Sequence, residues 1–79
     1  MPPRTSIPTT LHVPLDSSCI RSVAYSLDAA AMEVTFHNGS IYRYFDVPCP
    51  VYHALLKADS KGRYFAAAVR SCFRWERLQ

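Results

Sequence analysis

Alternating apolar and polar residues mark three short segments between residues 19 and 45. A period of two is the pattern of a half-buried β-strand. Ile20 falls out of phase within the first segment, so we expect a bulge near Arg21 and Ser22. The pattern predicts strands over residues 19–27, 32–37 and 41–45, with the first turn at residues 28–30.

The pair Asn38-Gly39 predicts a tight hairpin between the second and third strands. A two-residue loop would place Arg43 on the core face. A three-residue loop with a bulge at Gly39 instead places Tyr42 and Tyr44 there, because a shift of one residue exchanges the faces of a strand. We favour the bulge, since it keeps the charge off the core. Its cost is that two apolar side chains turn outward, Ile41 and Phe45.

Two helices are predicted after the sheet. Pro50 suits the first turn of a helix, where a backbone N–H has no partner anyway. This helix ends near Asp59, and Ser60 can cap a second helix from about Lys61 to about Glu76. The buried stripes are Val51, Ala54, Leu55 and Ala58 in the first helix, and Phe65, Ala68, Val69 and Cys72 in the second. The fold class is therefore α+β, a three-stranded antiparallel meander followed by two C-terminal helices packed on one face.

Four prolines within residues 1–16 predict an extended N-terminal arm, which leaves a single domain over residues 17–79. No apolar run approaches the ~18 residues of a transmembrane helix. The N-terminus lacks the apolar centre of a signal peptide. Three cysteines without paired spacing indicate reduced thiols, so we expect a cytoplasmic protein.

The net charge of +3 is unevenly distributed. From residue 57 onwards six basic residues stand against two acids, a balance of +4, whereas residues 1–56 carry −1. On a helical wheel four arginines of the predicted second helix fall within roughly 60°, opposite its apolar stripe: Arg63, Arg70, Arg74 and Arg77. An arginine side chain can donate two parallel hydrogen bonds to a phosphate and can stack on bases. These four side chains are therefore a candidate site for a polyanion. The alternative is a solvated face near a helix C-terminus, whose dipole favours cations.

Aromatic residues on the third strand are the second candidate. Tyr42, Tyr44 and Phe45 lie beside Arg43, and sheet aromatics near cations are one way in which proteins stack single-stranded bases. The alternative is that both tyrosines are core residues. In the favoured register Phe45 and Arg43 are the exposed pair. Trp75 could stack on a base or close the core, and we favour packing against the core.

Other chemistry has little support. Cys49 and His53 share one face at a helix start, where a thiolate is stabilised. A zinc site needs two more ligands and a catalytic pair needs an orienting group, and the sequence offers neither. We expect no enzyme, no metal and no cofactor. A thiol-based enzyme is the third alternative, and it predicts faster alkylation of Cys49 than of Cys19 or Cys72.

Three segments together match the pattern of a known family in their order and spacing. The first carries Ser17, Ser18, Ile20, Val23 and Tyr25. The second carries Met32, Val34, Phe36, Asn38, Gly39, Tyr42, Tyr44, Val47 and Pro48. The third carries Val51, Tyr52, Leu55, Leu56, Ala58, residues 60–65, Val69 and Arg70. This pattern resembles the KTSC domain. The chain departs from it at Ser26, where Asp is common, and at residues 66–68, where a polar residue follows the Tyr-Phe pair.

The resemblance implies a small accessory domain. KTSC domains occur as stand-alone bacterial proteins and at the C-terminus of some lysyl-tRNA synthetases, an association from which RNA binding has been suggested. We therefore expect a non-catalytic domain that binds RNA or another nucleic acid. The candidate residues are Arg63, Arg70, Arg74, Arg77, Lys61, Arg43, Tyr42, Tyr44 and Phe45. The alternative is a protein-interaction module or homodimer, because a three-stranded sheet leaves open edges.

Overall fold

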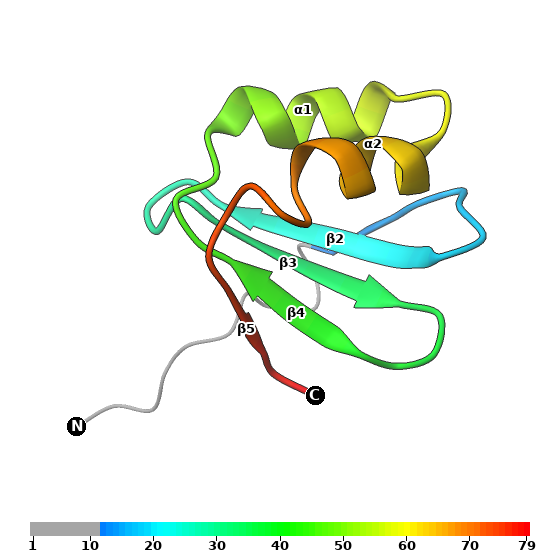
Figure 1. Ribbon diagram of the computed structural model, residues 1–79, viewed down its shortest axis with the longest axis horizontal. Coiled ribbons are helices and arrows are strands. Elements are labelled where there is room, and N and C mark those ends of the chain that lie inside the picture. Colours follow the sequence, from blue (N-terminus) through cyan, green and yellow to red (C-terminus); the bar gives the residue numbers. More distant parts are fainter. Residues whose placement is uncertain (1–11) are drawn as a thin grey trace.

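A five-stranded antiparallel sheet carries two helices in the computed structural model, which describes residues 12–79 (Figure 1). The strands are β1 (Val13–Pro14), β2 (Ile20–Ser26), β3 (Ala31–Phe36), β4 (Ile41–Tyr44) and β5 (Trp75–Arg77), and they lie in the sheet in chain order. The helices are α1 (Cys49–Lys57) and α2 (Lys61–Ala68). The predicted α+β class is confirmed, but the sheet has two strands more than the predicted meander.

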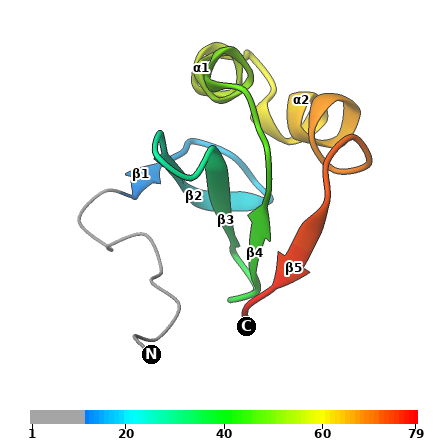
Figure 2. The same cartoon turned by 90° about the vertical axis from the view of Figure 1, so that its left-hand side faces the viewer.

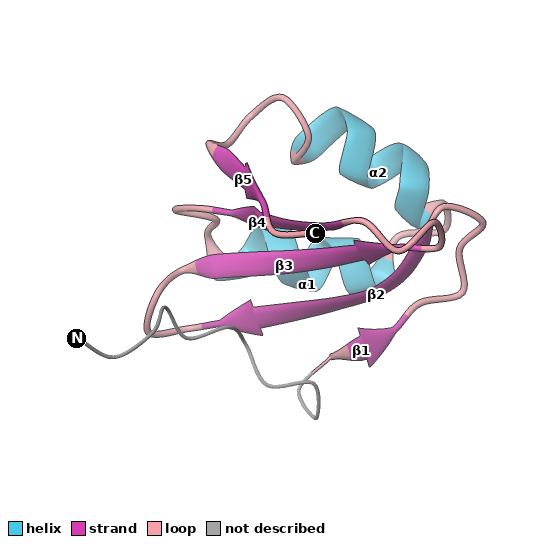
Figure 3. Cartoon of the chain, turned by 90° about the horizontal axis from the view of Figure 1, so that it is seen from below, coloured by secondary structure: helices cyan, strands magenta, loops and turns pink. Residues whose placement is uncertain are grey.

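Both helices cover the same face of the sheet (Figure 2). The opposite face carries neither of them (Figure 3). The buried core lies between the two layers and consists of Ile20, Val23, Met32, Val34, Tyr44, Val47, Leu55, Phe65 and Val69. Within residues 12–79 neither helix is long and apolar enough to cross a membrane.

The hairpin between β3 and β4 has the predicted bulge. Gly39 takes a φ of +92°, and its N–H donates to the Phe36 oxygen at 2.9 Å. The Phe36 N–H in turn donates to the Ser40 oxygen, also at 2.9 Å. Val34 consequently pairs with Tyr42 and Met32 with Tyr44, which turns both tyrosines toward the helices. The favoured register is therefore confirmed.

The first predicted strand is confirmed with one correction at its end. The register of β2 against β3 shifts between Ile20 and Ser22, where a bulge was expected, and Ile20 is fully buried. Leu27 was expected to be the last residue of this strand but lies beyond β2 and is 75% exposed. It begins a turn that ends at Ala30, whose φ of +50° reverses the chain.

β1 is the first strand that the alternation did not predict. Val13 pairs with Val23 and Pro14 with Ser22, and the Leu15 N–H donates to the Arg21 oxygen at 3.0 Å. A two-residue strand is too short for a period to show, and proline is tolerated at a sheet edge. This end of the predicted arm therefore belongs to the sheet, whereas the rest of the arm falls outside the described residues.

The second helix is shorter than predicted. Its N-cap is Ser60, as expected, with the hydroxyl accepting a hydrogen bond from the Arg63 N–H. However, α2 ends at Ala68 rather than near Glu76. The N–H groups of Val69 and Arg70 both reach the Phe65 oxygen at 3.0 Å, which closes the helix and reverses the chain. Cys72, expected in the buried stripe, is exposed.

The chain then returns to the sheet as β5. The Phe45 N–H donates to the Arg74 oxygen at 2.9 Å, and the Leu78 N–H donates to the Ile41 oxygen at 2.7 Å. This pairing satisfies backbone groups of β4 that a three-stranded meander would leave exposed at its edge. The four arginines consequently do not share one helix face, and the predicted arginine stripe is wrong.

Gly39→Ala is expected to lower the free energy of unfolding by about 1–2 kcal/mol, because an L-residue pays that cost in a left-handed conformation. Crowding is not the cause, since nothing lies within 4 Å of a Cβ added there. Gly62→Ala is the matched control. Its added Cβ meets Ser17 Oγ at an ordinary 3.8 Å, and alanine is the better helix former by about 1 kcal/mol. Urea unfolding followed by circular dichroism compares the two variants; equal losses would contradict this hairpin geometry.

Candidate functional site

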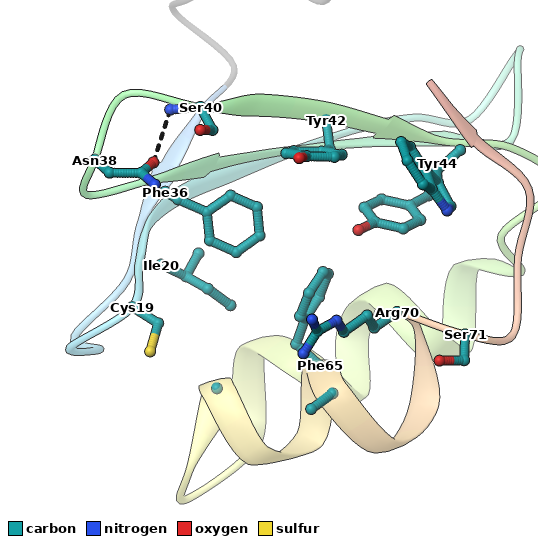
Figure 4. Close-up of a pocket in the computed structure, with 13 residues that line it drawn as sticks. Cys19, Ile20, Phe36, Asn38, Ser40, Tyr42, Tyr44, Phe65, Arg70 and Ser71 are labelled. Atoms are coloured by element: carbon teal, nitrogen blue, oxygen red, sulfur yellow. Dashed lines mark hydrogen bonds between the residues drawn. The ribbon is translucent and has the colours of Figure 1, made fainter. Parts of the chain in front are cut away.

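An open groove of about 680 Å³ lies between α2 and the helix-covered face of the sheet (Figure 4). The sheet, α2, the turn after α2 and β5 all contribute to it. Its lining residues are Cys19, Ile20, Phe36, Asn38, Ser40, Tyr42, Tyr44, Gly62, Phe65, Ala66, Arg70, Ser71 and Trp75.

Aromatic rings form most of the apolar lining. Phe65 of α2 meets Phe36 and Tyr44 edge to face, with ring centroids 5.6 and 5.4 Å apart. Tyr42 meets Phe36 in the same way at 5.8 Å. Edge-to-face contact is a favourable arrangement of aromatic rings. The groove therefore has an aromatic wall to which both the sheet and α2 contribute.

Trp75 extends this wall toward solvent. Its ring centroid lies 5.3 Å from that of Tyr42, yet the residue is 53% exposed. The expectation that Trp75 packs against the core is therefore wrong. β5 places the ring at the edge of the sheet, where it contacts the half-buried Tyr42 ring. Tyr42 is only half-buried, so both rings present apolar surface at the open side of the groove.

Arg70 supplies a positive charge to the groove. It lies in the turn after α2, and Figure 4 shows its guanidinium group beside Phe65, on the α2 side of the groove. Burial raises the pKa of the Tyr44 hydroxyl, and the nearby Arg70 charge acts in the opposite direction. Within residues 12–79 the guanidinium of Arg70 has no ion pair or hydrogen-bond partner.

Arg77 and three polar side chains complete the surroundings. Arg77 lies over the Tyr42 ring, 5.8 Å from its centroid, and its Nη2 donates to Ser40 Oγ at 3.5 Å. Asn38 Oδ1 accepts a hydrogen bond from the Ser40 N–H at 2.9 Å. The Ser71 side chain lies across the groove from these residues (Figure 4). The groove thus combines aromatic surface with the Arg70 guanidinium and uncharged polar groups, and Arg77 contacts two of its lining residues, Tyr42 and Ser40.

Arg43 is a sequence candidate that the structure removes from solvent. It lies on the sheet face opposite the helices, opposite Glu33 in the β3–β4 pairing. Its Nη2 lies 2.8 Å from Glu33 Oε2, and the two residues are only 6% and 3% exposed. His12 Nε2 lies 3.8 Å from the other Glu33 oxygen. The expectation that Arg43 is an exposed residue is therefore wrong, because its charge is buried in an ion pair.

The other basic candidates do not converge. Arg74 stacks on Phe45, 4.8 Å from the ring centroid, and both belong to the face away from the helices. Lys61 Nζ donates to the Ala58 oxygen at 2.9 Å, which satisfies a carbonyl at the end of α1. Arg63 is exposed in the first turn of α2. The structure brings together only four of the nine sequence candidates: Tyr42, Tyr44, Arg70 and Arg77.

Cys49 is half-buried at the start of α1, near the stacked rings of Tyr25 and Tyr52. Burial raises the pKa of both tyrosines, and the Coulombic effect of Cys49 adds to it. The described part of the chain contains no group of three or more His, Cys, Asp or Glu side chains that could hold a metal ion.

An antiparallel sheet with two helices on one face, and an aromatic groove between the sheet and α2, defines a small α+β domain. The chain belongs to the KTSC domain family, whose model matches residues 16–73. A crystal structure of a KTSC domain protein from Yersinia pestis superposes with a TM-score of 0.81 at 30% identity, and the match covers 86% of this chain and 96% of that one.

Two relatives show in which kinds of protein a similar sequence occurs. An uncharacterised protein of Stutzerimonas stutzeri is 49% identical over 54 residues, which are 68% of this chain and 76% of that protein. A lysine–tRNA ligase of Nostoc is 36% identical over 63 residues, which are 80% of this chain but 11% of the ligase. The same sequence pattern thus occurs both in a small protein and as a minor segment of a large enzyme.

Arg43→Ala is expected to lower the free energy of unfolding by about 3 kcal/mol, because it leaves the Glu33 carboxylate buried without its guanidinium partner. Arg63→Ala removes the same kind of side chain from an exposed position and should change stability by less than about 0.5 kcal/mol. Urea unfolding of the two variants tests the assignment. A loss below about 1 kcal/mol for Arg43→Ala would show that the pair contributes little to the fold.

Proposed function

We propose that this KTSC domain is a non-catalytic cytoplasmic domain that binds single-stranded RNA in the groove beside α2. One observation carries the proposal: partly exposed rings of Trp75 and Tyr42 lie in the same groove as the guanidinium of Arg70. Base stacking on an aromatic side chain contributes about 1–3 kcal/mol per base. The volume of about 680 Å³ lies within the range of roughly 300–1,000 Å³ typical of pockets that hold small organic groups.

Each group has a distinct role in this proposal. Trp75 and Tyr42 offer ring faces to the bases, and their position on neighbouring strands holds them together. Arg70 binds a phosphate, since it has no partner within residues 12–79, and Arg77 binds a second at the other side of the Tyr42 ring. Asn38 and Ser40 offer uncharged groups for the edges of a base.

The relatives support RNA over other polyanions. As its name states, the matched Nostoc enzyme is a lysine–tRNA ligase, and the matched segment is 11% of that enzyme. A segment of this size fits an accessory role beside the larger catalytic part. For this chain we propose the same class of ligand, with single-stranded RNA favoured because stacking requires bases that are free of a duplex.

Binding in the groove requires different residues from binding by the predicted arginine stripe. Arg43, Lys61 and Arg74 make contacts within the domain, so binding should not depend on their free charge. Arg63 is exposed but lies outside the groove lining. A charge change at Arg63 is therefore the matched control for the same change at Arg70.

Arg70→Glu is expected to weaken binding of a labelled single-stranded RNA at least tenfold, whereas Arg63→Glu, with an identical change of net charge, should weaken it less than threefold. Fluorescence anisotropy measures both affinities, and tRNA and single-stranded DNA of matched sequence are titrated alongside. Two bound phosphates predict a slope of about −1.4 for log K against log salt concentration. Equal losses in the two variants would contradict the groove as the site.

Trp75 gives a direct readout because it is the single tryptophan of the chain. RNA that stacks on its ring should quench its fluorescence with the same affinity that anisotropy reports. Trp75→Ala should weaken binding by about tenfold, which corresponds to the loss of one stacked base. Binding that leaves the tryptophan spectrum unchanged, or the absence of any binding at low salt, would overturn the proposal.

A further inference from the structure

The outer edge of β5 has backbone groups without partners in the described part of the chain. Backbone hydrogen bonds to β4 are made by Arg74 and Leu78, and Glu76 lies between them in the same register. Because neighbouring residues of a strand point their N–H and C=O groups in opposite directions, those of Trp75 and Arg77 point away from β4. Figure 2 shows β5 at the end of the sheet, with no further strand beside it.

This edge is complementary to a second copy of itself. If two β5 strands run antiparallel with Glu76 opposite Glu76, then Trp75 of each copy lies opposite Arg77 of the other. Both of these residues expose their backbone groups, so each Trp75–Arg77 pair forms two N–H···O bonds. The three-residue edge thus forms four backbone hydrogen bonds in one symmetric register.

The side chains on both faces support this register. On the groove face each Arg77 meets the half-exposed Trp75 ring of the other copy, a cation–π pair that occurs twice. On the opposite face the two Glu76 side chains meet, which alone would be unfavourable. However, each Glu76 lies diagonal to Arg74 of the second copy and beside its own Arg43, which also pairs with Glu33. Four guanidinium groups therefore balance the four carboxylates of Glu33 and Glu76 on this face.

We propose that two copies of this chain associate through antiparallel pairing of their β5 strands, which joins the two sheets into one. The helices then lie on the same face of the joined sheet, and the two grooves flank the symmetry axis with Trp75 of each copy at the junction. The contact is small, so the dimer is weak and forms at high protein concentration. This inference does not depend on what the groove binds.

A cysteine cross-link tests the register. With Cys19, Cys49 and Cys72 replaced by serine, Glu76→Cys should form a disulfide-linked dimer under mild oxidation, because directly opposed residues of a non-hydrogen-bonded pair have Cα atoms about 4.5 Å apart. Leu78→Cys is the control, since Leu78 lies opposite Arg74 rather than itself and should not cross-link. Equal cross-linking of the two variants would exclude the register.

A proline substitution tests the backbone pairing. Arg77→Pro removes an N–H that points to solvent in the monomer, which an edge strand tolerates. Arg77→Ala removes the same side chain but keeps the N–H. Sedimentation equilibrium from about 10 µM to 1 mM, without RNA, should show a dimer dissociation constant at least about tenfold higher for Arg77→Pro than for Arg77→Ala, because the proline variant loses two hydrogen bonds per dimer. Circular dichroism confirms that both variants fold. An unaltered chain that stays monomeric at 1 mM, with no Glu76→Cys cross-link, would overturn the proposal.

Discussion

The left-handed conformation of Gly39 is the constraint on which the rest of the structure depends. Its φ of +92° allows the bulge that pairs Val34 with Tyr42 and Met32 with Tyr44. A register shifted by one residue would exchange the two faces of β4. The tyrosines would then leave the groove, and Arg43 would enter the core. One backbone dihedral angle therefore decides which face of β4 is aromatic and which is charged.

The same register divides the sheet into two chemically different faces. Toward the helices, Phe36 of β3 and Tyr44 of β4 pack against Phe65 of α2, and together with Tyr42 and Trp75 they line an open groove. Away from them, Glu33, Arg43 and Glu76 lie side by side on three adjacent strands. The Glu33–Arg43 pair is buried, so its contribution comes mainly from the high cost of leaving either charge alone. The binding function that we propose therefore belongs to the helix-covered face, and the charged face is structural.

β5 contributes both to the groove and to the self-association that we propose. Its pairing with β4 brings Trp75 beside Tyr42 and Arg77 over the same ring, although these residues are more than thirty positions apart in sequence. It also creates a new edge whose backbone groups point outward. A short strand rich in charge usually protects an edge. In the dimer that we propose, the order Trp-Glu-Arg makes this edge complementary to a second copy, because Trp75 of each copy then lies opposite Arg77 of the other.

The local sequence determined β2, β3, β4, the Gly39 bulge, the Ser60 cap and the family, because alternation, turn residues and caps act over a few neighbouring positions. It also predicted Tyr42, Tyr44, Arg70 and Arg77 as site residues. The reason given for the two arginines was wrong, because Arg70 lies in the turn after α2 and Arg77 lies in β5. Residues 69–77 have a helical spacing of apolar side chains, and only pairing with the distant β4 edge makes their end a strand. The tertiary structure alone decided that Trp75 lines the groove and that Arg43 is buried, since both depend on hydrogen bonds and charges contributed by segments far apart in the chain.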